Sequence, residues 1–127
     1  VLGTPISANT AQPLTPMLVN SLENEASNAL VEGYTVAGKT GTGEIATPLG
    51  YTSSTTNTSF VGWGPAEDPK FLVYVWLEKP EISIWGSEVA APVFSDLVSD
   101  LVVLMNIPPD IVRHVEKPVD YRLALSE

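Results

Sequence analysis

A single lysine in the first half of this chain is followed by small residues that suit close contact with a ligand. Lys39 is the only cation among residues 1–69, and Thr40, Gly41 and Thr42 come directly after it. An ammonium group supplies positive potential, and a glycine without a Cβ lets another backbone approach closely. On a strand edge, such a segment can pair with an extended peptide and aim backbone N–H groups at the oxyanion that develops in acyl transfer.

The same stretch also matches the spacing of a phosphate-binding P-loop, with GYTVAGKT at residues 33–40. A P-loop requires a strand before it and a helix after it, so that backbone N–H groups of the turn can cradle phosphate. The pattern here predicts a helix before the motif and a loop after it. Nucleotide binding is therefore the weakest of the alternatives.

Hydrophobic periodicity places this segment on a strand. Thr15 and Pro16 are typical of a helix start, apolar residues follow at helical spacing, and Gly33 suits the helix end. Residues 34–41 alternate with a period of two and predict a strand. Residues 43–57 are rich in Ser, Thr, Gly and Pro and predict a long loop.

Two apolar runs, residues 58–64 and 71–78, predict a β-hairpin with a Pro-containing turn. The second run, FLVYVWL, is apolar on both faces, which is typical of a strand that is covered on both sides. Trp63 and Trp76 are expected in the core, because large aromatic residues in apolar strands usually pack there.

The remaining segments predict one more helix and two irregular ends. Residues 93–105 have an apolar face and Pro92 near their start, and Asn106-Ile107-Pro108-Pro109 stops the helix. Residues 1–14 and 110–127 show no period. The fold class expected is α+β, with an antiparallel sheet of three strands (residues 34–41, 58–64 and 71–78), an N-terminal helix and a C-terminal amphipathic helix.

Composition excludes several classes of function. The net charge of −9 argues against nucleic acid and anionic membrane surfaces as partners. The chain has no cysteine and one histidine, His114, which argues against thiol catalysis, Cys-based zinc sites and a Ser-His-Asp triad. His114 is expected to be exposed, without a catalytic role. We expect no metal and no other cofactor.

Five stretches, in order, resemble the C-terminal part of the penicillin-binding protein transpeptidase domain, most closely the class B, high-molecular-mass type. The resemblance covers residues 12–110, implying a transpeptidase part over 1–110 and a tail over 111–127. It also implies a partial penicillin-binding/β-lactamase-like fold. The stretches are GYTVAGKTGT, TSFVGWGP, FLVYVWLE, GSEVAAPVF and NIPPD.

The resemblance implies a peptidoglycan D,D-transpeptidase at the outer face of the bacterial cytoplasmic membrane. Such an enzyme binds β-lactams and cross-links stem peptides through an acyl-enzyme. By the same resemblance, Lys39 supplies positive potential and contacts the serine of a Ser-x-Asn motif, and Thr40 binds the substrate carboxylate. The N–H of Thr42 donates to the oxyanion, and Gly41 allows a peptide to approach the strand.

By this resemblance, Lys39-Thr40-Gly41 is one of the family's three catalytic motifs, Lys-Thr-Gly. The sequence contains no convincing copy of the other two. No lysine has a serine three positions before it, as Ser-x-x-Lys requires, and Ser7-Ala8-Asn9 lies too close to Lys39 to serve as the Ser-x-Asn motif. We therefore expect an inactive piece whose partner is the N-terminal part of the same domain. Self-association through residues 71–78 is the other outcome expected. The alternative function is a non-catalytic scaffold of the same fold in cell-wall assembly.

Overall fold

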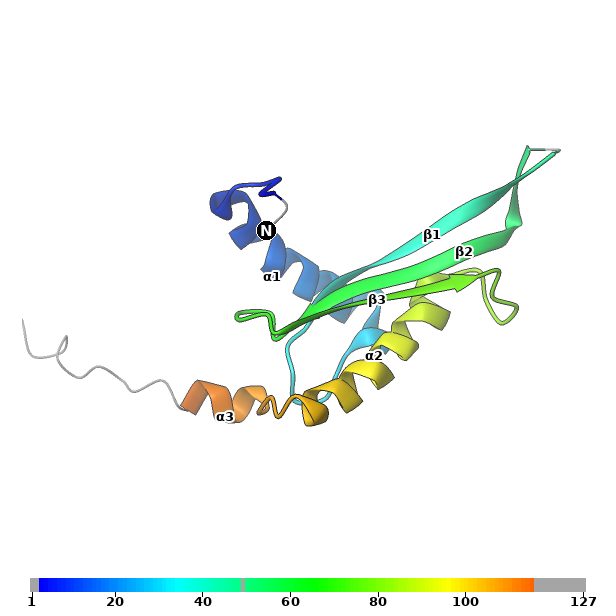
Figure 1. The fold of residues 1–127 in the computed structure, drawn as a ribbon. Coiled ribbons are helices and arrows are strands. Elements are labelled where there is room, and N and C mark those ends of the chain that lie inside the picture. Colours follow the sequence, from blue (N-terminus) through cyan, green and yellow to red (C-terminus); the bar gives the residue numbers. More distant parts are fainter. Residues whose placement is uncertain (1–2, 49, 116–127) are drawn as a thin grey trace, which may run out of the picture.

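The computed structural model describes residues 3–48 and 50–115 and has helices on an antiparallel sheet (Figure 1). The expected α+β class and antiparallel sheet are confirmed. In chain order, the elements are α1 (Ala8–Glu25), the 3-10 helix η1 (Ser27–Ala29), β1 (Ala37–Thr47), β2 (Gly50–Gly64), β3 (Phe71–Glu78), α2 (Gly86–Leu104) and α3 (Asp110–Val115).

The strands of the described residues follow the order β1-β2-β3, so β2 is central and β1 and β3 are edges. Thr40 of β1 lies opposite Phe60 of β2, and Phe60 lies opposite Val75 of β3. Because opposite residues share a face, these three side chains form one row. Lys39 and Val61 belong to the next row, on the other face of the sheet.

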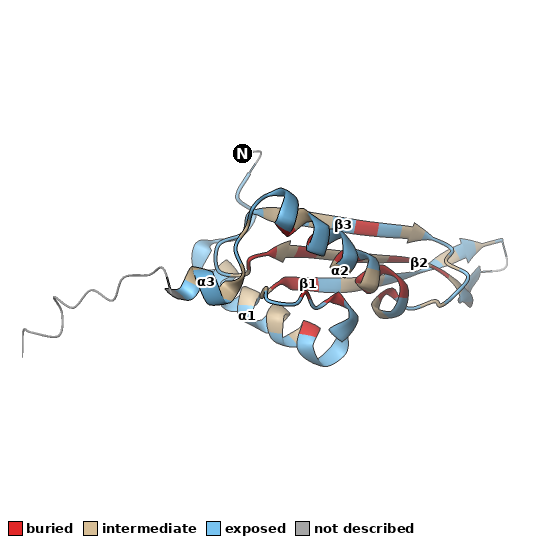
Figure 2. Ribbon diagram, turned by 90° about the horizontal axis from the view of Figure 1, so that it is seen from below, coloured by how far each residue is buried: buried red, intermediate tan, exposed pale blue. Residues whose placement is uncertain are grey.

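Helix α2 covers the face that carries Phe60, and the core lies between them (Figure 2). Phe60 and Phe94 are fully buried, with ring centroids 4.6 Å apart and ring planes at 43°. A Cβ on Gly62 would lie 2.6 Å from the Phe94 ring, so the absence of a side chain there lets the helix approach the sheet. Val98 and Val102 of α2 belong to the same buried core, together with Leu22 of α1.

The N-terminal helix begins earlier than the expected Thr15. Ser7 caps it, because the Ser7 hydroxyl accepts a hydrogen bond from the Thr10 N–H at 3.2 Å. The prediction of an irregular segment over residues 1–14 is therefore wrong for the residues from Ala8 onward. Both Pro13 and Pro16 lie inside α1. The helix ends at Glu25, not near Gly33, whose φ of +80° forms the turn toward β1.

The prediction of a loop over residues 43–57 is also wrong, since residues 43–47 belong to β1 and residues 50–57 belong to β2. β1 starts at Ala37 and runs on to Thr47, with a register shift between Glu44 and Ile45. Ser and Thr side chains favour local turns in isolation, but here β1 pairs with residues 50–52 and 56–57 of β2. Since a strand and not a helix follows Lys39-Thr40, the P-loop alternative is excluded.

β3 has the predicted bounds, and the turn before it contains a cis Gly64–Pro65 bond. β3 is nevertheless an edge strand within the described residues, and it is covered on one face only. Its outward side chains Leu72, Tyr74 and Trp76 are 68%, 60% and 52% exposed. The core position expected for Trp76 is therefore wrong, and Trp63, opposite Leu72, is only partly buried.

The predicted C-terminal helix, whose start the sequence left open, is α2. It begins at Gly86 and includes Pro92, and it ends before Met105 and Asn106, where Asn106 has a φ of +52°. The expectation of an irregular tail is wrong for Asp110–Val115, which form α3. Residues 116–127 lie outside the described residues.

Candidate active site

The four residues singled out by the sequence lie next to one another on β1, at an edge of the described sheet. The Lys39 side chain is exposed, and its Nζ donates a hydrogen bond to Thr40 Oγ1 at 3.3 Å. Thr42 is exposed as well, whereas Thr40 and Gly41 are partly buried. An ammonium group and a hydroxyl therefore stand together, where both can reach a carboxylate.

Lys39 belongs to the face of the sheet that α2 leaves open. Lys39 lies opposite Val61, which lies opposite Tyr74, and Gly41 is in the next row with Ser59 and Trp76. Tyr74 and Trp76 are among the exposed large side chains of β3. The open face thus combines a cation near one edge with an apolar surface near the other.

The start of α2 packs against the backbone of this segment. The Gly86 N–H donates to Thr42 Oγ1 at 3.3 Å. A Cβ on Gly86 would lie 2.8 Å from the Gly41 carbonyl oxygen and 2.9 Å from that of Ser59. Only glycine fits at this position without displacing the backbone. The N-terminus of α2, which is the positive end of the helix dipole, therefore lies close to β1. The sequence analysis missed Gly86, although it stands at the start of the GSEVAAPVF stretch.

Gly41 has a packing role in addition to the one expected from substrate approach. A Cβ at this position would lie 2.5 Å from Ser59 Oγ on the neighbouring strand. A larger residue would push Ser59 aside on the same face that carries Lys39. The absence of a side chain at Gly41 therefore leaves Ser59 in place and adds no bulk to this part of the open face.

Within the part of the chain that the structure describes, the site is incomplete for nucleophilic catalysis. The Lys39 ammonium has Thr40 as its side-chain hydrogen-bond partner, and none of the described serines is hydrogen-bonded to it. No described group of three His, Asp or Glu residues is placed to hold a metal ion. What the segment offers is positive charge, a hydroxyl and a strand edge.

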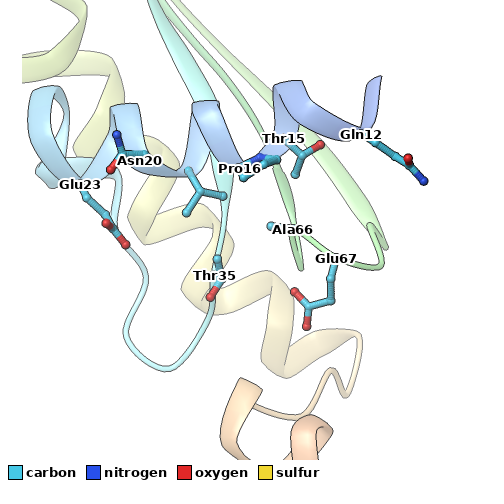
Figure 3. A pocket seen from close by; sticks show the side chains of 9 residues that line it. Gln12, Thr15, Pro16, Asn20, Glu23, Thr35, Ala66 and Glu67 are labelled. Atoms are coloured by element: carbon cyan, nitrogen blue, oxygen red, sulfur yellow. The ribbon is translucent and has the colours of Figure 1, made fainter. Parts of the chain in front are cut away.

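A cleft of ≈ 510 Å³ lies away from these four residues, between α1 and the turn after β2. Figure 3 shows side chains of α1 facing Thr35, Ala66 and Glu67 across it. None of Lys39, Thr40, Gly41 and Thr42 lines this cleft. It is therefore separate from the predicted site.

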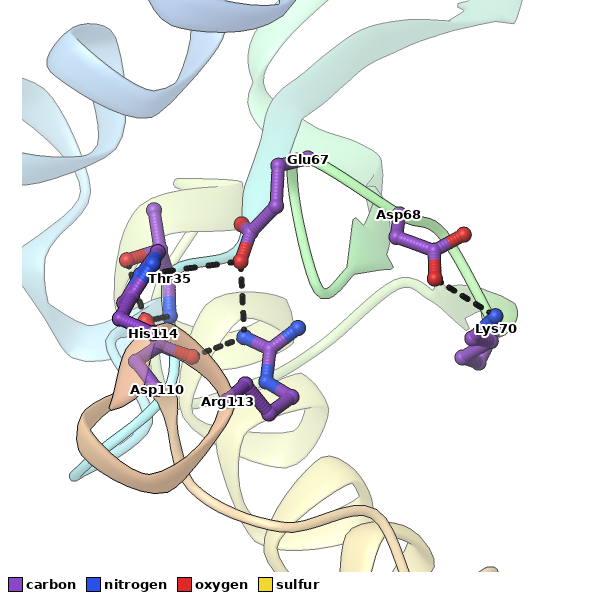
Figure 4. Close-up of polar contacts among 7 residues, drawn as sticks. All are labelled: Thr35, Glu67, Asp68, Lys70, Asp110, Arg113 and His114. Carbon is purple, nitrogen blue, oxygen red and sulfur yellow. Dashed lines mark hydrogen bonds and ion pairs between the residues drawn. The ribbon is translucent and has the colours of Figure 1, made fainter. Parts of the chain in front are cut away.

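A cluster of polar side chains joins α3 to the residues that precede β1 (Figure 4). Asp110 Oδ2 accepts hydrogen bonds from the Thr35 N–H and hydroxyl, at 2.7 and 2.6 Å. Arg113 pairs with Asp110 and, at 3.2 Å, with Glu67. His114 is exposed, as expected, and its Nε2 lies 3.8 Å from Glu67 Oε1. No sequence pattern had linked these residues, because they lie far apart in the chain.

Comparison with known proteins settles the family. Residues 2–99 match the model of the penicillin-binding protein transpeptidase domain. The chain belongs to the penicillin-binding protein transpeptidase family. The resemblance seen in the sequence is thus confirmed, and the order of strands and helices can be compared directly with solved transpeptidase domains.

Two curated relatives show how much of a transpeptidase the chain represents. The probable peptidoglycan D,D-transpeptidase PbpC of Pseudomonas aeruginosa is 41% identical over 83 residues, which are 65% of this chain and 15% of the relative. Stage V sporulation protein D of Bacillus subtilis is 38% identical over 88 residues, 68% of this chain and 14% of the relative. The chain therefore spans about one seventh of the length of these transpeptidase-family relatives.

Solved transpeptidase domains share the fold. The apo transpeptidase domain of Burkholderia pseudomallei penicillin-binding protein 3 superposes with a TM-score of 0.75 at 34% sequence identity. The match covers 83% of this chain and 33% of that domain. Penicillin-binding protein 3 of Mycobacterium tuberculosis, solved with ampicillin, gives a TM-score of 0.69 at 26% identity.

Proposed function

We propose that this chain is the C-terminal part of a serine-type peptidoglycan D,D-transpeptidase. The complete polypeptide, meaning this chain joined to the N-terminal part of the domain, would bind penicillin and cross-link stem peptides through an acyl-enzyme. The observation that carries the proposal is the placement of Lys39-Thr40-Gly41-Thr42 on edge strand β1, with the Lys39 ammonium 3.3 Å from the Thr40 hydroxyl.

In this proposal, each residue of the segment has a separate task. Lys39 raises the positive potential of the cleft and contacts the serine of the Ser-x-Asn motif in the N-terminal part. Thr40 donates to the substrate carboxylate, and the Thr42 N–H is one of the two donors to the oxyanion. Gly41 lets the stem peptide or β-lactam lie against the strand.

The proposed location is the outer face of the cytoplasmic membrane, where peptidoglycan is cross-linked. It is supported by relatives named as peptidoglycan transpeptidases. Among the residues that the structure describes, no helix has the length and apolar character to cross a membrane.

The 127-residue chain alone is expected not to form a covalent penicilloyl adduct, because none of its serines stands in a Ser-x-x-Lys context. The test is a fluorescent penicillin, followed by denaturing gel electrophoresis and mass spectrometry of the labelled protein. The complete polypeptide, treated in parallel, is expected to be labelled once, at a serine outside this chain.

Two results would contradict this account. Stable labelling of the 127-residue chain at one serine would show that the nucleophile lies within it. A complete polypeptide that folds but takes no label would favour the alternative, a non-catalytic scaffold of the same fold.

The exposed side of β3 indicates which part of the polypeptide contacts this chain. Leu72, Tyr74 and Trp76 form an apolar surface next to an edge with unpaired backbone groups. We propose that the N-terminal part of the domain covers it in the complete polypeptide. The isolated chain is then expected to self-associate through β3, by strand addition or domain swapping.

Sedimentation velocity over about a hundredfold range of concentration measures this association, because mass action makes the oligomer fraction depend on concentration. Leu72→Lys on β3 is expected to shift the chain toward monomer. Leu104→Lys, at a similarly exposed position on α2, is the matched control and is expected to change little. A compact monomer at every concentration of the parent chain would show that the edge is already protected.

A further inference from the structure

The backbone just before β1 is held by a carboxylate that lies 75 residues further along the chain. Asp110 Oδ2 accepts from both the N–H and the hydroxyl of Thr35, at 2.7 and 2.6 Å (Figure 4). The contact is reciprocal, because the Asp110 N–H donates to the Gly33 carbonyl at 2.9 Å. Three hydrogen bonds thus fix residues 33–35 to the start of α3.

This junction also includes the turn between β2 and β3. The Ala66 N–H donates to the Thr35 carbonyl at 2.8 Å, and Arg113 joins the carboxylates of Asp110 and Glu67. The side chains of Asp110 and Arg113 are largely buried, at 18% and 16% exposure. Water therefore competes weakly for these bonds, and they are stronger than surface ion pairs.

The Asp110 carboxylate is held in its ionised form. Burial by itself would raise its pKa, but the hydrogen bonds from Thr35 and Arg113 outweigh burial and lower the pKa below its ordinary value. A charged acceptor forms shorter and stronger hydrogen bonds than a neutral one. Thr35 is therefore anchored by a carboxylate at neutral pH.

The anchor lies four residues before Lys39 on an edge strand. Within the described residues, β2 is the only strand that pairs with β1, so no neighbouring strand holds the backbone groups along the other edge of β1. Besides that pairing and the packing of α1 and α2 on β1, hydrogen bonds hold the chain at Thr35, just before the strand, and at Thr42, where the Gly86 N–H donates to the hydroxyl. Lys39, Thr40 and Gly41 lie between these two points.

We propose that Asp110 and Thr35 are positioning residues for the Lys39-Thr40-Gly41-Thr42 segment. They set the position of β1 along its own axis, and thereby the place of the Lys39 ammonium and the Thr42 N–H in the site. Asp110 acts through Thr35 and needs no contact with substrate. The catalytic consequence rests on the proposed transpeptidase function, whereas the anchoring of β1 does not.

The test uses a pair of substitutions at one position. Thr35→Val keeps the shape of the side chain and removes the hydroxyl donor, while Thr35→Ser retains that donor. Ser95→Ala is the control for stability alone, since Ser95 Oγ donates to the Leu30 carbonyl, also at 2.6 Å, in a contact between α2 and the segment after η1. Asp110→Asn removes the charge of the acceptor.

Two readouts separate anchoring from chemistry. Hydrogen–deuterium exchange of the 127-residue chain reports the peptide that contains residues 39–42. Stopped-flow acylation of the complete polypeptide by a fluorescent penicillin gives the first-order acylation rate constant separately from the affinity of the non-covalent complex.

Thr35→Val and Asp110→Asn are expected to speed exchange across residues 39–42 and to slow acylation by about tenfold, less than the 10²-fold that a 1 Å misplacement can cost. Thr35→Ser is expected to restore both quantities. Ser95→Ala is expected to lower the melting temperature and leave both quantities close to the parent values.

Unchanged exchange at residues 39–42 in Thr35→Val would overturn the proposal, as would equal acylation rates in Thr35→Val and Ser95→Ala. If the parent complete polypeptide is not acylated at all, the proposed function fails. The exchange comparison still decides in that case whether Thr35 and Asp110 anchor β1.

Discussion

Lys39→Ala is expected to slow acylation of the complete polypeptide by penicillin by about 10²-fold or more, the scale of losing one electrostatic contact to the transition state. Lys39 is the only cation among the first 69 residues, and its side chain is exposed on edge strand β1. If Lys39 acts as proposed, its removal takes away the positive potential that stabilises the charge developing on the oxyanion. The acylation rate constant measured with a fluorescent penicillin reports the loss.

A second lysine provides the matched control. Lys70 is exposed in the turn before β3 and pairs with Asp68 at 2.7 Å, far from the Lys39 segment in the sheet. Lys70→Ala removes the same charge from the molecule and is expected to leave acylation unchanged. Equal acylation rates for Lys39→Ala and the parent would remove the basis for assigning the Lys-Thr-Gly motif to the site.

Phe94→Ala is expected to destabilise the chain by about 3–5 kcal/mol, the usual cost of truncating a buried phenylalanine. Phe94 is fully buried, contacts the Phe60 ring at 4.6 Å between centroids, and occupies the space above Gly62. The cavity left by the ring would lie between α2 and β2, in the core that joins the helix to the described sheet. Since the free energy of unfolding of a small domain is about 5–15 kcal/mol, this substitution removes a large part of it.

Urea denaturation followed by circular dichroism measures this loss. Leu97→Ala on the same helix is the control, because Leu97 is about half exposed and its truncation leaves a smaller cavity. We expect a far smaller shift of the midpoint for Leu97→Ala. Similar midpoints for Phe94→Ala and the parent would mean that α2 does not pack on β2 as described.

Where periodicity was strong, the sequence was sufficient to predict the elements. The apolar run from Phe71 to Leu77 predicted β3, and the spacing of Phe94, Val98 and Val102 predicted the buried face of α2. The placement of Lys39 on a strand also followed from alternation around it. These features depend on residues that are close together in the sequence, and a local sequence pattern records them.

Features that depend on distant partners escaped prediction. The Ser- and Thr-rich residues after Gly50 form a strand because β1 pairs with them, and local composition alone favours a loop. Trp76 is exposed because it lies on the face of the described sheet that α2 leaves open, which follows from helix packing and not from hydrophobicity. The Asp110–Thr35 contact joins residues 75 positions apart, and no local signal indicates it.

The most direct test of the central claim is a crystal structure of the complete polypeptide after acylation by a β-lactam. We expect the β-lactam carboxylate within hydrogen-bond distance, about 2.6–3.2 Å, of Thr40 Oγ1, and the acyl carbonyl oxygen at a similar distance from the Thr42 N–H. The Lys39 ammonium should face the same cleft. An acyl group bound elsewhere, with β1 empty and Lys39 in solvent, would contradict the assignment of this segment to the active site.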